Sequence, residues 1–315
     1  MILLLLSSLW NVQANGKKVR TGNRSDAIII PSAVIHYARP NLYFSEGRYA
    51  GPADIWNPDK GFLVQSIDPE SYNLNFPTTG ANHLFFDLVI SGGFSELTWE
   101  PVTHEGITAT MTPLPGIHIW IHDSSLVLRV VLTGPDARNQ WDNPHPNPIA
   151  KPKLPQTFEL VGRDRYGIEV VKYGFVLKQW FVARDGHLPF RTRTYSDHLA
   201  WCNNIGYQMP RVRDLTNAVT KFGPSIVGAN PSSPGNHYMR HIDAGFSSEW
   251  GYLFFYNYTA PGDGAGDAGF LPLNYYWTSD VTGHEQFTVN LDDGRIGSHP
   301  PKTEAGVVCV SNLKP

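Results

Sequence analysis

The sequence predicts a mostly β fold whose C-terminal part is α+β, and three observations lead to that prediction. Short runs of β-branched and aromatic residues recur between turn residues in the first half, as at 61–66 and 83–90. The chain holds 29 glycines and 25 prolines, which favours many short strands and turns over helix bundles. Beyond residue 194 the apolar residues take helical spacing, so helices join the strands there.

The clearest alternation in the first half lies between residues 116 and 133. Ile117, Ile119 and Ile121 alternate with less apolar residues, 123–124 is a two-residue turn, and leucine and valine alternate again beyond it. That pattern predicts a hairpin with one buried face. With further strands expected at 27–30, 61–66 and 83–90, it indicates an Ig-like β-sandwich over residues 15–155.

Prolines crowd into residues 134–155, where the strand pattern stops. Such spacing favours an extended stretch that cannot join a central strand. We interpret this segment as a linker and place a domain boundary at its end, so that the second domain spans 156–315. A long ordered loop within a single domain is the alternative.

The second half mixes helices with strands. Apolar residues from Tyr195 to Ile205 recur at helical spacing, Thr194 or Ser196 is available as the N-cap, and Gly206 stops the helix. A second, shorter helix is expected over 211–219. Strands are expected at 158–162, 168–175, 176–182, 275–278, 286–291 and 306–310.

The first residues have the pattern of a secretory signal. Residues 2–10 are apolar apart from two serines, and small residues at 12–14 suit a signal peptidase. No Lys or Arg precedes the apolar run, so the signal, placed at 1–14, is atypical or begins upstream. The run is too short for a transmembrane span, which takes about 20 apolar residues. We therefore expect export through the periplasm to the cell surface or the medium, and no transmembrane span.

Three stretches resemble catalytic or ligand-binding motifs in sequence, but the spacing or the context of each excludes the corresponding chemistry. Ser196-Asp197-His198 spells a triad, but neighbours on a helix point in different directions and cannot relay a proton. His284-Glu285 opens like a zinc-protease motif, yet Thr288 stands where the second histidine is required. The stretch 262–267 precedes no helix pattern, which removes a phosphate loop, and it lacks the closing carboxylate of an EF-hand. We expect no catalytic residue, no metal and no cofactor.

Eight short motifs of the second half occur in a characteristic order. They include Ala-Trp-Cys at 200–202, Arg-Val-Arg-Asp-Leu-Thr-Asn at 211–217 and Gly-Val-Val-Cys-Val at 306–310. The others lie at 180–181, 195–196, 206–207, 244–251 and 276–280. In this order they resemble the enterobacterial adhesion-domain family, which occurs in intimin- and invasin-type surface proteins and in short exported Zir-type proteins. The resemblance is strong from residue 158 onward and weak before it.

The resemblance implies a C-type-lectin-like module over 156–315 and a role at the bacterial surface. Cys202 and Cys309 are the only cysteines of a chain that we expect to be exported, so we expect them to form the disulfide that closes such a module. Calcium-dependent lectins of this fold carry a Glu-Pro-Asn or Gln-Pro-Asp loop, which this sequence lacks. The family resemblance therefore implies the fold without its calcium-dependent sugar site.

The predicted function is that of an adhesin-like binding protein of the virulence-associated kind, not an enzyme. Its expected partner is a host-cell or bacterial surface protein, with a glycan as the alternative ligand and an intimin-like outer-membrane translocator as a further partner. The alternative functions are an exported glycan-active enzyme and a structural cap on a surface assembly. Nucleic acid is not expected, because the net charge is −3 and the Lys and Arg residues are scattered.

The predicted contact surface is the long loop 222–274. Long loops in compact domains carry function or disorder, and this one holds aromatic residues of the kind enriched at protein contacts. Phe246 and Trp250 are expected to pack under the loop as its core. The exposed candidates for partner binding are Tyr238, His241, Tyr256 and Tyr258.

Overall fold

The computed structural model describes residues 33–114, 126–184, 193–221, 225–257, 267–270 and 275–314. The segment Ser32–Pro315 is one compact unit. The predicted signal segment 1–14, the predicted strand 27–30, the turn at 123–124 with the strand before it, and Tyr258 lie outside the described residues.

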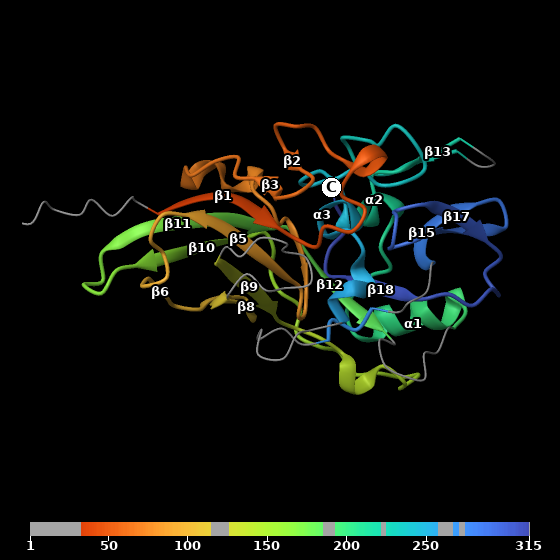
Figure 1. Ribbon diagram of the computed structural model, residues 1–315. Helices are drawn as coiled ribbons and strands as arrows, with labels where there is room; N and C mark the ends of the chain where they lie inside the picture. The colour runs from red at the N-terminus through yellow and green to blue at the C-terminus, as the bar shows by residue number, and fades with distance from the viewer. Residues whose placement is uncertain are drawn as a thin grey trace, which may run out of the picture. The chain divides into compact units, whose positions relative to one another are not determined.

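A seven-stranded antiparallel sheet contains most strands of the first half, in the order β2-β3-β1-β5-β9-β8-β7 (Figure 1). Its strands are β1 (Val34–Arg39), β2 (Trp56–Asn57), β3 (Gly61–Leu63), β5 (Phe85–Ser91), β7 (Val102–His104), β8 (Ile107–Leu114) and β9 (Val127–Thr133). The neighbours β5 and β9 are buried along almost their whole length, because their side chains are apolar on both faces apart from Asp87 and Arg129, which pair with each other. The strands predicted near 61–66, 83–90 and 125–133 are thus confirmed.

A second antiparallel sheet, ordered β11-β10-β6, packs against this one. It consists of β6 (Thr98–Trp99), β10 (Gln156–Arg163) and β11 (Glu169–Leu177). Phe158 and Phe175 stack with ring centroids 5.2 Å apart, and Phe175 meets Phe86 of the first sheet at 5.9 Å. Two sheets joined by interlocking side chains form a sandwich core. In Figure 1 the strands β10 and β11 accordingly lie beside β1 and β5.

The boundary predicted at residue 155 does not coincide with a break in the sheets. β10 lies after it but pairs with β6 before it, with Gly162 opposite Trp99. A third sheet, ordered β18-β12-β4, joins β12 (Gln179–Arg184) in parallel to β4 (Thr79–Ala81), and in antiparallel fashion to β18 (Val307–Val310). The sandwich therefore takes strands from both predicted domains.

The proline-rich segment 134–155 packs against both halves of the chain. Trp180 of β12 donates its indole N–H to Pro135 O at 2.8 Å, and the Tyr207 hydroxyl donates to Ala150 O at 2.8 Å. The backbone N–H of Ile149 donates to the carbonyl of Ile205 at 3.1 Å. These contacts favour the alternative in which the segment is an ordered loop within one compact unit.

The first predicted helix is confirmed as α1 (Tyr195–Asn204). The Thr194 hydroxyl accepts from the backbone N–H of Asp197, and Gly206 follows with a φ of 85° that favours glycine. The second, α2 (Val212–Leu215), is shorter than the predicted 211–219. It ends because Thr216 is extended and its hydroxyl donates to Gly294 O at 2.9 Å.

The last part of the chain forms a three-stranded antiparallel sheet of β15 (Tyr276–Thr282), β16 (Glu285–Val289) and β17 (Ile296–His299). The sequence did not indicate β17, and the final strand β18 pairs with β12 instead of joining this sheet. The long predicted loop 222–274 contains regular elements as well. These are β14 (Ile226–Val227), which pairs with β13 (Val219–Thr220), the helix α3 (Phe246–Trp250) and the 3-10 helix η4 (Leu253–Asn257).

The predicted fold class, mostly β with an α+β C-terminal part, is confirmed. One hydrophobic cluster runs from Ala33 to Val310 and includes residues of all four sheets that have three or more strands among the described residues. Within the described ranges, no helix is both long and apolar enough to cross a bilayer.

Candidate binding surface and its support

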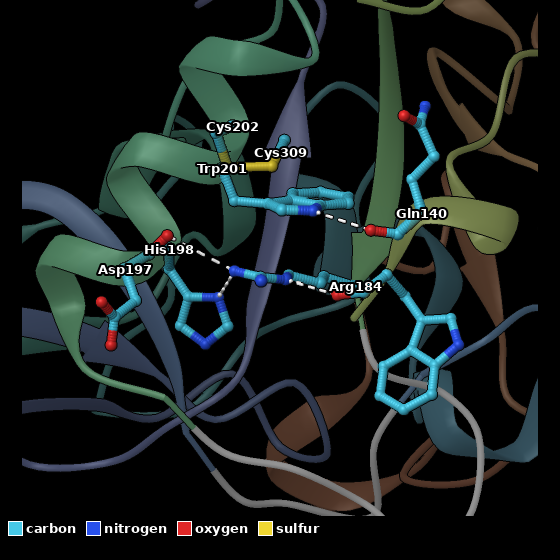
Figure 2. The surroundings of a disulfide bond; sticks show 8 residues. Gln140, Arg184, Asp197, His198, Trp201, Cys202 and Cys309 are labelled. Atoms are coloured by element: carbon cyan, nitrogen blue, oxygen red, sulfur yellow. Dashed lines mark hydrogen bonds between the residues drawn. A yellow bond between two sulfur atoms is a disulfide. The ribbon is translucent and has the colours of Figure 1, made fainter. Parts of the chain in front are cut away.

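The disulfide predicted from the sequence is present between Cys202 of α1 and Cys309 of β18 (Figure 2). Their Cα atoms lie 5.5 Å apart, across a sequence separation of 107, and both residues are fully buried. The bond fastens the only described helix of ten residues to the strand that pairs with β12. It is a structural cross-link, because a buried disulfide offers no sulfur to an outside thiol.

Figure 2 shows the guanidinium of Arg184 against the ring of Trp201, on the side of the ring away from the disulfide. Its carbon is 4.8 Å from the centre of that ring, and its Nε donates to the carbonyl of Trp141 at 2.9 Å. The Trp201 indole N–H in turn donates to Gln140 O at 3.3 Å. A cation between an aromatic face and carbonyl oxygens is well placed, because each partner compensates part of its lost hydration.

His198 is buried next to this guanidinium and does not belong to a catalytic triad. Its Nε2 lies 3.0 Å from Ala305 O and its Nδ1 lies 3.4 Å from Nη1 of Arg184. Burial first, and the charge of Arg184 second, lower the pKa of His198 to about 3. The Ser196 hydroxyl meets the Thr194 hydroxyl at 3.1 Å instead of the imidazole. The Ser-Asp-His sequence therefore serves the start of a helix, as predicted.

Acidification is expected to destabilise the protein through His198. In the unfolded chain His198 has a pKa of about 6.5 and binds a proton below that pH. In the folded protein it remains neutral until about pH 3, so protons favour the unfolded state between these values. The contribution of His198 to the free energy of unfolding is complete above pH 6.5 and falls by about 1.4 kcal/mol per pH unit below it. Urea unfolding at pH 7 and pH 5 should show about 2 kcal/mol more loss for the wild type than for His198→Gln. Equal losses in the two proteins would contradict this account.

Aromatic rings gather where loop 41–49 meets η4. The aromatic patch, as we call it, comprises the exposed Tyr43 and Phe44, the partly buried Tyr252 and Phe254, and the buried Tyr49 and Phe255 on which they pack. Tyr43 and Phe44 expose 46% and 42% of their surface, while Tyr252 and Phe254 are partly buried. Tyr43 contacts Tyr252 with centroids 5.7 Å apart, and Phe44 contacts Tyr49 at 5.0 Å. Arg48 adds a cation at the edge, 4.8 Å above the ring of Tyr49.

Asn41 holds loop 41–49 against the end of α3. Its side-chain amide donates to the carbonyls of Trp250 and Tyr252 at 2.6 and 3.2 Å, and its side-chain oxygen accepts from Tyr43 N–H at 3.1 Å. The last bond is an Asx turn, the local motif that lets asparagine start a tight turn. The Asn41 side chain therefore fastens loop 41–49 to the end of α3 and to the residue just before η4.

The buried Arg240 supports the backbone of the same loop from below. Its guanidinium donates to the carbonyls of Asn41 and Tyr43 at 2.8 and 2.9 Å. It also donates to Glu249 O at 3.0 Å, which ties the loop to α3. Gly251 must be glycine here, because its φ is 71° and a Cβ would come within 2.0 Å of Nη2 of Arg240.

Phe44 is held in a strained conformation. Its φ is 48°, in the left-handed region that costs a non-glycine residue about 1 to 2 kcal/mol. The hydroxyl of Tyr238 lies 3.3 Å from Phe44 O and so supports this geometry from the protein interior. The ring of Phe44 contacts Tyr49 and Tyr252 and still exposes 42% of the residue surface.

Two of the four residues predicted as exposed partner contacts are buried, so that part of the prediction is wrong. Tyr238 and Tyr256 have no exposed surface, because they fill the space under the patch loop. The Tyr256 hydroxyl accepts from Asn41 N–H at 2.9 Å, and burial raises the pKa of Tyr256 to about 12. His241 is partly buried, with Nδ1 2.7 Å from Ile242 O. Tyr258 lies outside the described residues.

The prediction that Phe246 and Trp250 are buried is confirmed, since both are fully buried. The exposed members of the patch, Tyr43 and Phe44, were not predicted from the sequence, because all the predicted contact residues lay in loop 222–274. A local signal exists: two adjacent large rings stand between the turn residues Asn41 and Gly47. Rings placed within a turn have little room to be buried by their own segment.

Acidic and imidazole side chains do not gather into a metal site within the described ranges. Asp292 and Asp293 are neighbours, and burial together with the charge of Asp293 raises the pKa of Asp292 to about 6. Asp293 is buried and pairs with Arg295 at 3.0 Å. Glu285 accepts a hydrogen bond from Ser298 at 2.6 Å, so it braces β16 against β17.

No family model matches the sequence, and no curated protein matches it. Among solved structures, the chain is similar to invasin, described as a bacterial integrin-binding protein, with 13% identity and a TM-score of 0.48. That similarity covers 88% of this chain and 39% of the invasin chain, so the chain spans well under half of that structure.

Two intimin structures are similar as well. An intimin mutant from EHEC O157:H7 shares 13% identity over 74% of this chain and 87% of its own, with a TM-score of 0.35. The C-terminal 282-residue fragment of intimin, in complex with the intimin-binding domain of the translocated intimin receptor, shares 13% identity with a TM-score of 0.39. It covers 74% of this chain and 59% of the fragment. Identities and scores this low do not transfer a partner.

Proposed function

We propose that the chain is an exported adhesin-like protein that binds a cell-surface protein through the aromatic patch. The observation that carries the proposal is Phe44, an exposed ring on strained backbone supported by buried Arg240 and Tyr238. The ordered motifs that resemble the enterobacterial adhesion-domain family support a place at the bacterial surface.

The chemistry of the patch favours a protein partner over a glycan. Tyrosine, phenylalanine and arginine are enriched at the centre of protein interfaces, where rigid rings contribute contact area at low entropic cost. Sugar recognition also needs polar groups that converge on the ligand hydroxyls. Here the carbonyl of Tyr43 already accepts bonds from Arg240 and Tyr238 inside the protein.

Replacing the two exposed rings is expected to abolish tight binding without unfolding the chain. Phe44→Asn suits the backbone, because asparagine tolerates the left-handed region far better than phenylalanine, and Tyr43→Ser removes the second ring. We expect the double variant to bind cultured epithelial cells about 30-fold more weakly in flow cytometry, as for the loss of hot-spot residues worth about 2 kcal/mol.

Tyr166→Ser is the matched control, because Tyr166 is 72% exposed on the turn between β10 and β11 and lies outside the patch. This variant should bind as the wild type does. Treating the cells with protease should remove binding, whereas treating them with glycosidases should leave it. Undiminished binding by the double variant would refute the patch, and binding lost to glycosidases alone would refute a protein receptor.

A further inference from the structure

The carboxyl group of Glu249, on α3, is fully buried and accepts hydrogen bonds from both halves of the chain. The backbone N–H and the hydroxyl of Thr79 donate to its Oε2 at 2.9 and 2.6 Å. The Thr78 hydroxyl donates to Oε1 at 2.8 Å, and the Thr78 N–H lies 3.1 Å from both oxygens. The Asp243 N–H donates to Oε1 at 2.9 Å. Five donors thus converge on one carboxyl group.

Glu249 fastens α3 to the first half of the chain. Its two threonine partners lie at the start of β4, and the indole N–H of the next helix residue, Trp250, donates to Thr79 O at 3.1 Å. The other polar residues of α3 face the second half instead, where the Ser247 hydroxyl donates to Leu215 O at 2.7 Å. The end of α3 that carries Glu249 is therefore placed by its contact with β4.

The same end of α3 carries carbonyl groups that hold loop 41–49. Glu249 O accepts from the Arg240 guanidinium at 3.0 Å, and Trp250 O accepts from the Asn41 side-chain amide at 2.6 Å. The Arg240 and Asn41 side chains also bind the backbone of the loop. A shift of this helix end would displace both supports of the loop together.

We propose that Glu249 is a positioning residue of the aromatic patch, an inference that rests on the proposed function of the patch. Its carboxyl group fixes the helix end, and the helix end fixes the loop that presents Tyr43 and Phe44. Glutamine cannot take this role. Each carboxyl oxygen faces a backbone N–H, from Thr79 or Asp243, and an amide offers only one oxygen to the two.

Hydrogen exchange of Glu249→Gln, measured by NMR on the chain alone, tests the positioning role. The Asn41 N–H donates to the Tyr256 hydroxyl, and the Tyr43 N–H donates to the Asn41 side chain. We expect both amides to exchange about 10-fold faster than in the wild type, because loss of one buried acceptor costs about that factor in the stability of the local structure.

Leu160→Ala is the control for general destabilisation. Leu160 is fully buried on β10, so its truncation lowers the Tm through a cavity in the sandwich. The loop amides open locally and should keep their wild-type rates in this variant. Equal acceleration at Asn41 and Tyr43 in Leu160→Ala and Glu249→Gln would overturn the positioning role.

A milder variant keeps the test decisive if Glu249→Gln does not fold. Thr79→Val keeps the shape of the side chain and removes the hydroxyl that donates at 2.6 Å. It should accelerate exchange at Asn41 and Tyr43 in the same direction, by a smaller factor. Unchanged exchange of these two amides in the folded variants would overturn the proposal, whether or not the patch binds a partner.

Binding to the cultured epithelial cells tests the consequence for the patch. At a temperature where all variants are folded, Glu249→Gln should bind about 10-fold more weakly, and Leu160→Ala should bind as the wild type does. Undiminished binding by Glu249→Gln would overturn the proposal where Phe44→Asn with Tyr43→Ser has lost binding. If that double variant binds normally, the proposed function fails, and the exchange rates still decide whether Glu249 positions the loop.

Discussion

Reduction of the Cys202–Cys309 disulfide is expected to lower the free energy of unfolding by about 4 to 5 kcal/mol. The bond closes a loop across a sequence separation of 107, and in the chain-entropy view a loop of this size removes many conformations from the unfolded state. Because both sulfurs are fully buried, the protein must be unfolded in reductant and refolded under reducing conditions before urea titration.

The comparison of oxidised with reduced wild type isolates the cross-link, since both forms keep the sulfur atoms in the core. The double variant Cys202→Ala with Cys309→Ala should lose more, because the methyl groups leave a cavity beside Trp201. Reductant should leave the stability of that variant unchanged. If reduced and oxidised wild type differ by less than about 1 kcal/mol, the bond does not constrain the unfolded chain as the entropy of loop closure requires.

Local chemistry explains which elements the sequence revealed. The helix Tyr195–Asn204 was predictable because its cap, its apolar spacing and its glycine stop all lie within one short stretch. The strand Val127–Thr133 was predictable because leucine and valine alternate along it, although the alternation predicted one buried face and the strand is buried on both. The cysteine pairing followed from there being only two cysteines in a chain expected to be exported.

The missed elements depend on partners far away in the sequence. Thr79–Ala81 has no apolar alternation and becomes a strand because it pairs in parallel with Gln179–Arg184, about a hundred residues later. The predicted boundary at 155 failed to mark a break for the same reason, since Gln156–Arg163 finds its partner Thr98–Trp99 before the proline-rich segment.

The exposed residues of the candidate surface could not be identified from the sequence either. Composition indicated aromatic residues at the contact, but it could not distinguish rings that support a surface from rings that form it. Tyr238 and Tyr256 have the polar edge expected of contact residues, yet their hydroxyls bond the backbone of loop 41–49 from inside. The exposed ring of Phe44 depends on a positive φ, which sequence patterns do not reveal for phenylalanine.

Loss of Arg129 from the centre of the seven-stranded sheet is expected to cost about 3 to 5 kcal/mol of unfolding free energy. Asp87 of β5 and Arg129 of β9 lie directly opposite each other, and both side chains are almost fully buried. The carboxylate accepts two bonds from the guanidinium, at 2.8 and 3.1 Å, and the guanidinium also lies 4.1 Å from the centre of the Phe85 ring.

Arg129→Met keeps much of the side-chain length but leaves the Asp87 carboxylate buried without its bidentate partner, and this uncompensated charge is the source of the cost. The double variant Asp87→Leu with Arg129→Met should recover most of the loss, because an apolar pair of similar volume needs no compensation. Lys172→Met is the matched control. Its ion pairs with Glu159 and Glu169 are partly exposed, at 3.6 and 3.8 Å, so it should cost less than about 1 kcal/mol. Urea unfolding of the four proteins measures the comparison, and a double variant as unstable as Arg129→Met would show that lost packing, not the unpaired charge, sets the cost.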